Sequence, residues 1–110
     1  MNKMQEWLYR ASHELGLRVE VDYVVKLADG RSLVAKAYFP HLSNPGGILV
    51  FDWSDTVDAS ARRELAATGI GTSTFGAPSP DEKFDIESYR LMFAEWGWTG
   101  PNDEKPPWIP

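Results

Sequence analysis

The chain contains no cysteine and only two histidines among its 110 residues. Because disulfides, thiolate zinc sites and cysteine nucleophiles all need that side chain, all three are excluded. A cysteine-free chain is compatible with a reducing compartment, and we expect a cytoplasmic protein. The aspartates at positions 52, 55 and 58 lack the ligand spacing of a calcium loop, so we expect no metal and no cofactor.

Long apolar runs are also missing. No segment approaches the ~20 apolar residues of a membrane span, and residues 1–16 contain no apolar stretch typical of a signal peptide. Basic residues are in the minority, with 11 Lys and Arg against 16 Asp and Glu. Since non-specific nucleic-acid binding depends on basic side chains that neutralise phosphates, we expect neither nucleic acid nor membrane as a partner.

The acidic residues that are present lie mainly in the second half of the chain. Residues 51–110 carry eleven acidic and five basic residues, a net charge of −6, whereas residues 1–50 carry a net charge of +1. An acidic surface attracts basic partners and speeds their association. The charge distribution therefore favours a basic protein as the partner.

The first half of the chain predicts a helix followed by a β-hairpin. Apolar residues at helical spacing indicate a helix over residues 2–15 that ends at Gly16. The period then changes to two over residues 17–27, and Asp29 and Gly30 form a hairpin turn before a return strand over residues 32–39. Strict alternation places Leu17, Val19, Val21 and Tyr23 on one face of the first strand, and Leu33, Ala35, Ala37 and Phe39 on one face of the second.

The middle of the chain predicts a strand, a helix and a second strand. Residues 48–51 are all apolar, which is typical of a central strand buried on both faces. A short helix over residues 56–68, capped by Asp55 or Thr56, leads to a strand over residues 70–75. This succession indicates two parallel strands joined by a helical crossover.

The end of the chain predicts one more helix and a tail. Ser79, Pro80 and Glu82 form a capping-box pattern that starts a helix running to Trp96. Gly97 ends that helix, and Trp98 is placed to fold back onto Phe93. Four prolines in residues 99–110 predict an irregular tail.

These elements together predict an α+β fold. Residues 1–98 form a single small domain with a mixed sheet of about four strands, followed by the Pro-rich C-terminal tail 99–110. The element order is N-terminal helix, β-hairpin, strand–helix–strand and C-terminal helix.

No complete catalytic motif accompanies this fold. Neither Ser43 nor Ser54 lies in a nucleophile elbow, so we expect no enzyme and assign no catalytic residue. Trp is enriched at binding hot spots and makes cation–π contacts with basic side chains, and nearby acidic groups attract the same side chains by charge pairing. We therefore predict a partner-binding face made of the acids and the tryptophan after the 48–51 strand and of the acids around the start of the last helix: Asp52, Trp53, Asp55, Asp58, Asp81, Glu82, Asp85 and Glu87.

In size, acidity and lack of cysteine the chain is similar in general character to bacterial immunity proteins. The resemblance implies a protein that neutralises a basic toxin, such as a nuclease, by covering it with acidic residues.

Two alternatives stay open at this point. The first is a small hydrolase or ligand-binding enzyme that uses Asp52 with His41 or Ser54 at the end of the 48–51 strand. A concave pocket there would favour the enzyme, whereas a flat or convex acidic face would favour the binding protein. The second is an assembly subunit that uses Trp98 or the tail 99–110 against a neighbour.

Overall fold

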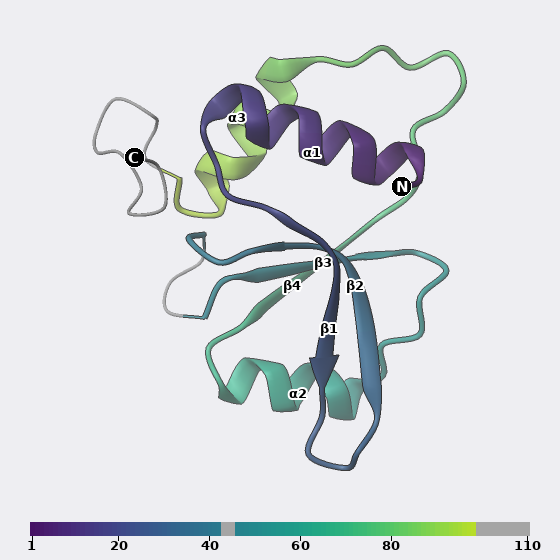
Figure 1. Ribbon diagram of the computed structural model, residues 1–110, viewed down its shortest axis with the longest axis vertical. Helices are drawn as coiled ribbons and strands as arrows, with labels where there is room; N and C mark the ends of the chain where they lie inside the picture. Colours follow the sequence, from purple (N-terminus) through teal and green to yellow (C-terminus); the bar gives the residue numbers. More distant parts are fainter. Residues whose placement is uncertain (43–45, 99–110) are drawn as a thin grey trace.

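The computed structural model describes residues 1–42 and 46–98, and in them three helices surround a four-stranded sheet (Figure 1). This confirms the α+β class and the predicted element order, whereas the predicted tail 99–110 lies outside the described residues. The elements are α1 (Lys3–Leu15), β1 (Glu20–Lys26), β2 (Ser32–Phe39), β3 (Ile48–Asp52), α2 (Ala59–Ala67), β4 (Gly71–Phe75) and α3 (Ile86–Glu95).

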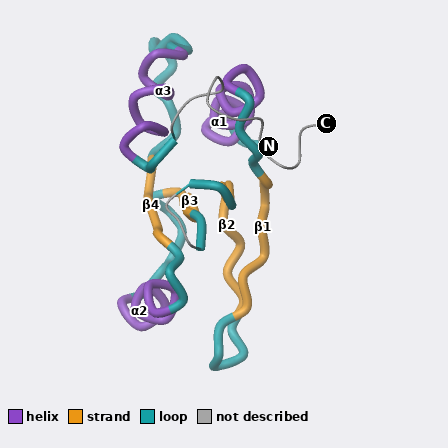
Figure 2. Tube along the Cα trace, turned by 90° about the vertical axis from the view of Figure 1, so that its left-hand side faces the viewer, coloured by secondary structure: helices purple, strands orange, loops and turns teal. Residues whose placement is uncertain are grey.

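The sheet has the strand order β1-β2-β3-β4 (Figure 2). β1 and β2 form the predicted antiparallel hairpin, and β3 is antiparallel to β2. β3 and β4 are parallel, with Ile48 beside Gly71 and Asp52 beside Phe75, so the strand–helix–strand prediction is confirmed.

Helices cover both faces of the sheet. α1 and α3 pack on one face, which we call the two-helix face, and α2 packs on the other, the α2 face. β3 lies between these layers, with Ile48 and Val50 packed toward the two-helix face, and Leu49 and Phe51 toward the α2 face. All four side chains are buried, as predicted, and each contributes about 1.5–3 kcal/mol.

The predicted caps of α2 are wrong. Asp58 caps the helix, because its Oδ1 accepts a hydrogen bond from the Ala61 amide at 2.8 Å. Asp55 is occupied elsewhere: its Oδ2 accepts from the Asp52 amide at 2.8 Å and closes a turn directly after β3. α2 therefore starts at Ala59, three residues after the predicted start at Thr56.

The predicted start of the last helix is also wrong. Residues 79–82 make one isolated turn, in which the Glu82 amide donates to the Ser79 carbonyl at 3.0 Å. α3 begins only after Asp85, whose Oδ1 accepts from the Glu87 amide at 3.1 Å. The capping-box residues are therefore outside the helix.

Packing of Phe84 accounts for the late start of α3. Its ring meets Trp7 edge to face at 5.8 Å and stacks on Tyr89 at 5.5 Å, while the Arg10 guanidinium lies 4.1 Å from its centre. These contacts with α1 hold the chain before α3 in a non-helical course, so tertiary packing overrides the local signal.

The other end of α3 follows the prediction. Gly97 has φ 96°, which suits a helix-ending glycine, and the Trp98 amide donates to the Phe93 carbonyl at 2.9 Å. Trp98 is therefore packed against the core beneath the two-helix face.

The predicted alternation along the hairpin is wrong, because both strands change face midway. Tyr23 and Ala35 pack on the α2 face, whereas Val19, Ala37 and Phe39 pack on the two-helix face. The pairing ladder is interrupted between the Val21–Ala37 pair and the Tyr23–Ala35 pair, where Asp22 has a positive φ of 50°.

Gln5 of α1 holds this kink. Its side chain is 3 % exposed, and its Nε2 donates to Asp22 Oδ1 at 2.8 Å and to the Lys36 carbonyl at 3.0 Å. Its Oε1 accepts from the Asn2 amide at 2.9 Å and completes the cap of α1. A left-handed conformation costs a non-glycine residue about 1–2 kcal/mol, which these hydrogen bonds offset.

Candidate functional site

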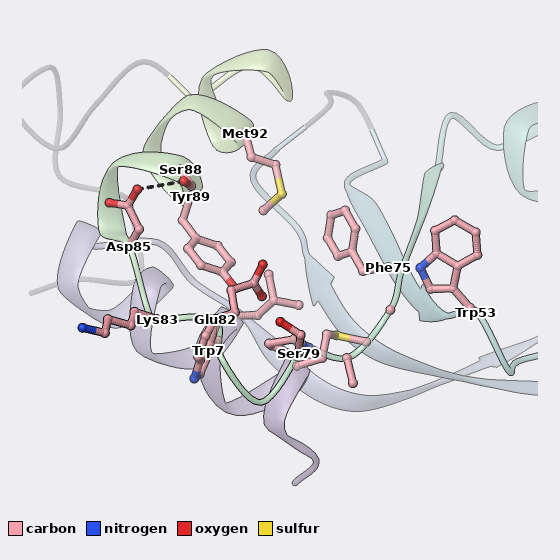
Figure 3. Close-up of a pocket in the computed structure, with 15 residues that line it drawn as sticks. Trp7, Trp53, Phe75, Ser79, Glu82, Lys83, Asp85, Ser88, Tyr89 and Met92 are labelled. Carbon is pink, nitrogen blue, oxygen red and sulfur yellow. Dashed lines mark hydrogen bonds between the residues drawn. The ribbon is translucent and has the colours of Figure 1, made fainter.

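A groove of about 860 Å³ opens between α1, α3 and the segment 76–85 (Figure 3). It lies at the carboxyl end of the parallel pair β3 and β4, because Trp53 directly follows β3, and Phe75 ends β4. Ligands of α/β sheets bind preferentially outside the carboxyl ends of parallel strands. The groove is therefore the leading candidate site.

The interior of the groove is apolar. Met4 and Leu8 come from α1, Phe75 from β4, and Tyr89 and Met92 from α3. Met4 and Leu8 are buried, while the other three are partly exposed to the groove. Two methionines give the interior a flexible, polarisable wall that can adapt to different apolar side chains.

Trp53 stands at one end of the groove, beside Phe75 (Figure 3). It is 73 % exposed, the highest exposure among the described large hydrophobic residues. Its amide donates to the Phe75 carbonyl at 3.0 Å, and its ring lies against Gly76, where a Cβ atom would stand 3.1 Å from Trp53 Cδ1. One side of the indole thus lies against Gly76, and the rest of its surface is exposed to solvent.

The opposite end carries polar groups. Glu82, Lys83 and Asp85 line the groove there, and this end therefore carries two carboxylates and one ammonium group. Ser88 Oγ donates to Asp85 Oδ2 at 3.0 Å. Burial, with a smaller effect of Glu82, raises the pKa of Tyr89 to about 12. Its neutral hydroxyl can donate a hydrogen bond.

Of the predicted partner-binding residues, the structure brings three to this groove: Trp53, Glu82 and Asp85. Asp81 is exposed in the turn before α3 and does not line the groove. The predicted partner-binding residues therefore do not all lie at this groove, and their role in binding stays a prediction.

Asp55 and Asp58 are used within the fold. Asp55 pairs with Lys36 at 3.5 Å, and Asp58 pairs with Arg31 Nη1 at 2.9 Å while it caps α2. The hydrogen bond from the Arg31 guanidinium, helped by the Ala61 amide, lowers the pKa of Asp58. Each of these two carboxylates is therefore already paired with a basic side chain of the same chain.

Asp52 and Glu87 are likewise engaged locally. Asp52 Oδ2 accepts from Ser54 Oγ at 3.0 Å, and Glu87 pairs with Arg90 at 3.1 Å on α3. Asp52 ends β3 but is not among the residues that line the groove.

Sequence reasoning missed most of the groove. Trp7 of α1 is half-buried and lines the groove between Lys3, 5.4 Å above its ring, and Phe84. The sequence offered little signal for this groove beyond Gly76 and Ala77, two small residues that follow β4 and line it.

The residues of the predicted hydrolase are only partly together. Ser54 contacts Asp52, but Phe39 pairs with Ile48, so His41 follows β2 at the start of β3, whereas Asp52 ends it. That length of strand corresponds to about 13 Å. Among residues 1–42 and 46–98, no group of three or more His, Asp or Glu side chains is placed to hold a metal ion.

None of the helices in the described part of the chain is long and apolar enough to cross a membrane. Comparison with protein-family models, with curated proteins and with solved structures gave no match.

Proposed function

We propose that this chain is a non-enzymatic protein-binding domain that holds a basic segment of a partner protein in the groove between α1 and α3. One observation supports this proposal above the others: a single groove combines an apolar interior, the exposed Trp53 and the carboxylates of Glu82 and Asp85. Binding hot spots are typically aromatic anchors in such pockets with polar groups at the rim.

The groove suits an arginine or lysine next to an apolar side chain. A guanidinium stacked on the open face of Trp53 would gain about 0.5–2 kcal/mol from the cation–π interaction. A second basic group would pair with Glu82 or Asp85, and an apolar side chain would enter between Met4 and Met92. This binding role requires no covalent bond to be broken or formed.

The finer form of the proposal is an immunity-type inhibitor of a basic toxin, such as a nuclease, in the cytoplasm. The chain's net charge of −5 supports it, because an acidic inhibitor is steered toward a basic target. In this form the aromatic groove supplies the anchor, and the overall charge supplies the association rate.

The test is capture of partners by matched variants. The immobilised wild-type chain is exposed to its native lysate, and the proteins retained after moderate-salt washes are quantified against those retained by Trp53→Ala and Glu82→Gln. Asp58→Asn is the control, because it removes a carboxylate outside the groove and keeps a good helix cap.

We expect one basic protein that the wild type and Asp58→Asn retain equally and that Trp53→Ala loses by at least about ten-fold, the loss for a truncated hot spot. Equal retention by Trp53→Ala would contradict binding in the groove. If Asp58→Asn lost the partner and Trp53→Ala retained it, the interface would instead lie on the predicted acidic residues after β3.

One observation favours a second candidate, a ligand-binding enzyme near Asp52: the end of β3 adjoins a concave groove instead of a flat face. Enclosure of a small apolar ligand would change the emission of Trp53, and any turnover should be lost in Asp52→Asn. A ligand that binds and turns over without a protein partner would replace the first proposal.

A further inference from the structure

The two edges of the sheet differ in a way that points to a second interaction surface. β1 forms one edge and carries three charged residues, Glu20, Asp22 and Lys26, together with the kink at Asp22. Charges and kinks are the devices by which exposed edge strands avoid pairing with other chains. β1 is therefore a protected edge.

β4 forms the other edge and has none of these devices. Its residues, Gly71–Phe75, include no charge and no proline, and all five are partly exposed. Within the part of the chain that the structure describes, no strand pairs with its outer side (Figure 2). An unprotected edge of this kind is suited to pairing with another strand.

The backbone hydrogen bonds between β4 and the β3 side of the sheet show which backbone groups of β4 are available. The Gly71 amide donates to Gly47 at 2.9 Å, and the Phe75 carbonyl accepts from Trp53 at 3.0 Å, so these residues point their backbone groups toward β3. Because successive residues of a strand point these groups to opposite sides, those of Thr72 and Thr74 face the free edge.

We propose that this edge pairs with the same edge of a second copy of the chain, antiparallel and centred on Ser73. In this register Thr72 of each copy lies opposite Thr74 of the other, and each pair exchanges two backbone hydrogen bonds, as the outward groups require. Ser73 lies opposite Ser73 of the second copy in the intervening pair, which shares no hydrogen bond.

The side chains also suit this register. Facing threonines form favourable cross-strand pairs, and Phe75 lies opposite Gly71 of the second copy, which has no side chain to obstruct the ring. No charged residue faces another along Gly71–Phe75, although each copy carries a net charge of −5. A two-fold axis at Ser73 makes the surface self-complementary and closes the assembly at two copies.

The proposed dimer does not depend on partner binding in the groove. The two interactions should respond to salt in opposite directions, so the salt dependence distinguishes them. Strand pairing alone buries less than the ~1,600 Å² of a standard interface, so the dimer should be weak. Because two acidic copies repel each other, added salt should strengthen the dimer, whereas it should weaken binding of a basic partner.

The first experiment is sedimentation of the full chain from about 10 µM to about 1 mM, a range in which weak contacts become populated. We expect a monomer–dimer equilibrium that shifts toward the dimer with salt. Thr74→Pro should shift it back to the monomer, because proline removes an outward-facing amide and not a bond to β3. Thr74→Val keeps that amide and is the matched control.

A second experiment tests the register and does not depend on the proline variant folding. The chain has no cysteine, so Ser73→Cys introduces the only thiol. Opposed residues that share no hydrogen bond have Cα atoms about 4.5 Å apart, within disulfide range, whereas Thr72→Cys would place two thiols on Cα atoms about 8 Å apart, beyond it. Ser60→Cys on the exposed side of α2 measures random collisions.

We expect Ser73→Cys to cross-link at least about ten-fold faster than Thr72→Cys and Ser60→Cys, because pairing raises the effective thiol concentration. A monomer at every concentration, with all three variants cross-linking equally slowly, would overturn the proposal. So would faster cross-linking through Thr72→Cys, or a dimer that none of these thiols traps, because either result places the contact in another register or on another surface.

Discussion

Replacing Gln5 by alanine should destabilise the fold more than any other single polar substitution on α1. The side chain makes three hydrogen bonds, to Asp22 Oδ1, to the Lys36 carbonyl and to the Asn2 amide. At about 1 kcal/mol each, their loss lowers the free energy of unfolding by about 3 kcal/mol. Alanine is the best helix former, so α1 itself loses nothing through propensity.

Urea denaturation followed by circular dichroism measures this change in the free energy of unfolding. In a domain of this size about 3 kcal/mol corresponds to a fall in Tm of about 10–20 °C. Ser12→Ala is the matched control, because Ser12 is also buried on α1 but its hydroxyl donates to the Leu8 carbonyl of its own helix. Its loss should change stability by less than about 1 kcal/mol.

Gln5→Glu adds a pH-dependent form of the same test. A carboxylate at position 5 would face Asp22 Oδ1 and the Lys36 carbonyl, so the folded state raises its pKa above the ordinary value of about 4.3. The penalty is therefore absent below that value and grows as the pH rises through the folded-state pKa. A loss below about 1 kcal/mol in Gln5→Ala, or a pH-independent Gln5→Glu, would refute the role of Gln5 in holding the kink.

Three further predictions concern other parts of the fold. Gly46→Ala should lower the free energy of unfolding by about 2 kcal/mol or more, because its Cβ would stand 2.6 Å from the Gly69 carbonyl oxygen. Gly30→Ala, with φ 91° and open space around it, should lower it by only about 1 kcal/mol. Urea denaturation measures both changes. The Arg31 guanidinium lowers the pKa of Asp58, and the Arg31 amide and guanidinium lower the pKa of Asp29. The stability that these aspartates contribute is therefore present above their ordinary pKa of 3.8 and is lost as the pH falls through their folded-state pKa values. Arg31→Gln should raise the pKa of both carboxyl groups in an NMR titration, and unchanged pKa values would contradict these ion pairs. Burial raises the pKa of Tyr89 to about 12, so an ultraviolet titration should show a step near 12, and stability should fall as the pH rises above 10. A Tyr89→Phe spectrum that keeps the step near 12 would contradict the assignment.

The sequence predicted those parts of the fold that depend on local patterns. The apolar run Ile48–Phe51 indicated a strand buried on both faces, and Gly16 and Gly97 marked the ends of two helices. Each of these signals acts through the backbone conformation or burial of a few neighbouring residues, so no distant partner is needed to interpret it.

The errors arose where a distant side chain decides the structure. The change of face in the hairpin depends on Gln5, which is far from both Asp22 and Lys36 in the sequence. The late start of α3 depends on Phe84 packing against Trp7. No periodicity carries this information, because the alternation of one strand does not show which helix lies above it.

The candidate site was only partly predictable for the same reason. Aspartates near Trp53 indicated an acidic binding face, but a carboxylate in the sequence does not show whether a cation of the same chain already pairs with it. Arg31 reaches Asp58 from the hairpin turn, and Lys36 reaches Asp55 from β2. Glu82 and Asp85, which lie on the segment that the sequence assigned to a helix, line the groove instead.

The groove has its two helical walls at opposite ends of the described chain: α1 is the first helix and α3 the last. During synthesis at ~5–20 residues per second, α1 therefore emerges on the order of ten seconds before the helix that completes the groove. Until then Met4 and Leu8 lie on an uncovered apolar surface, and no partner can be held. Binding thus becomes available only after α3 has been made, and an interrupted chain would expose a surface that chaperones recognise.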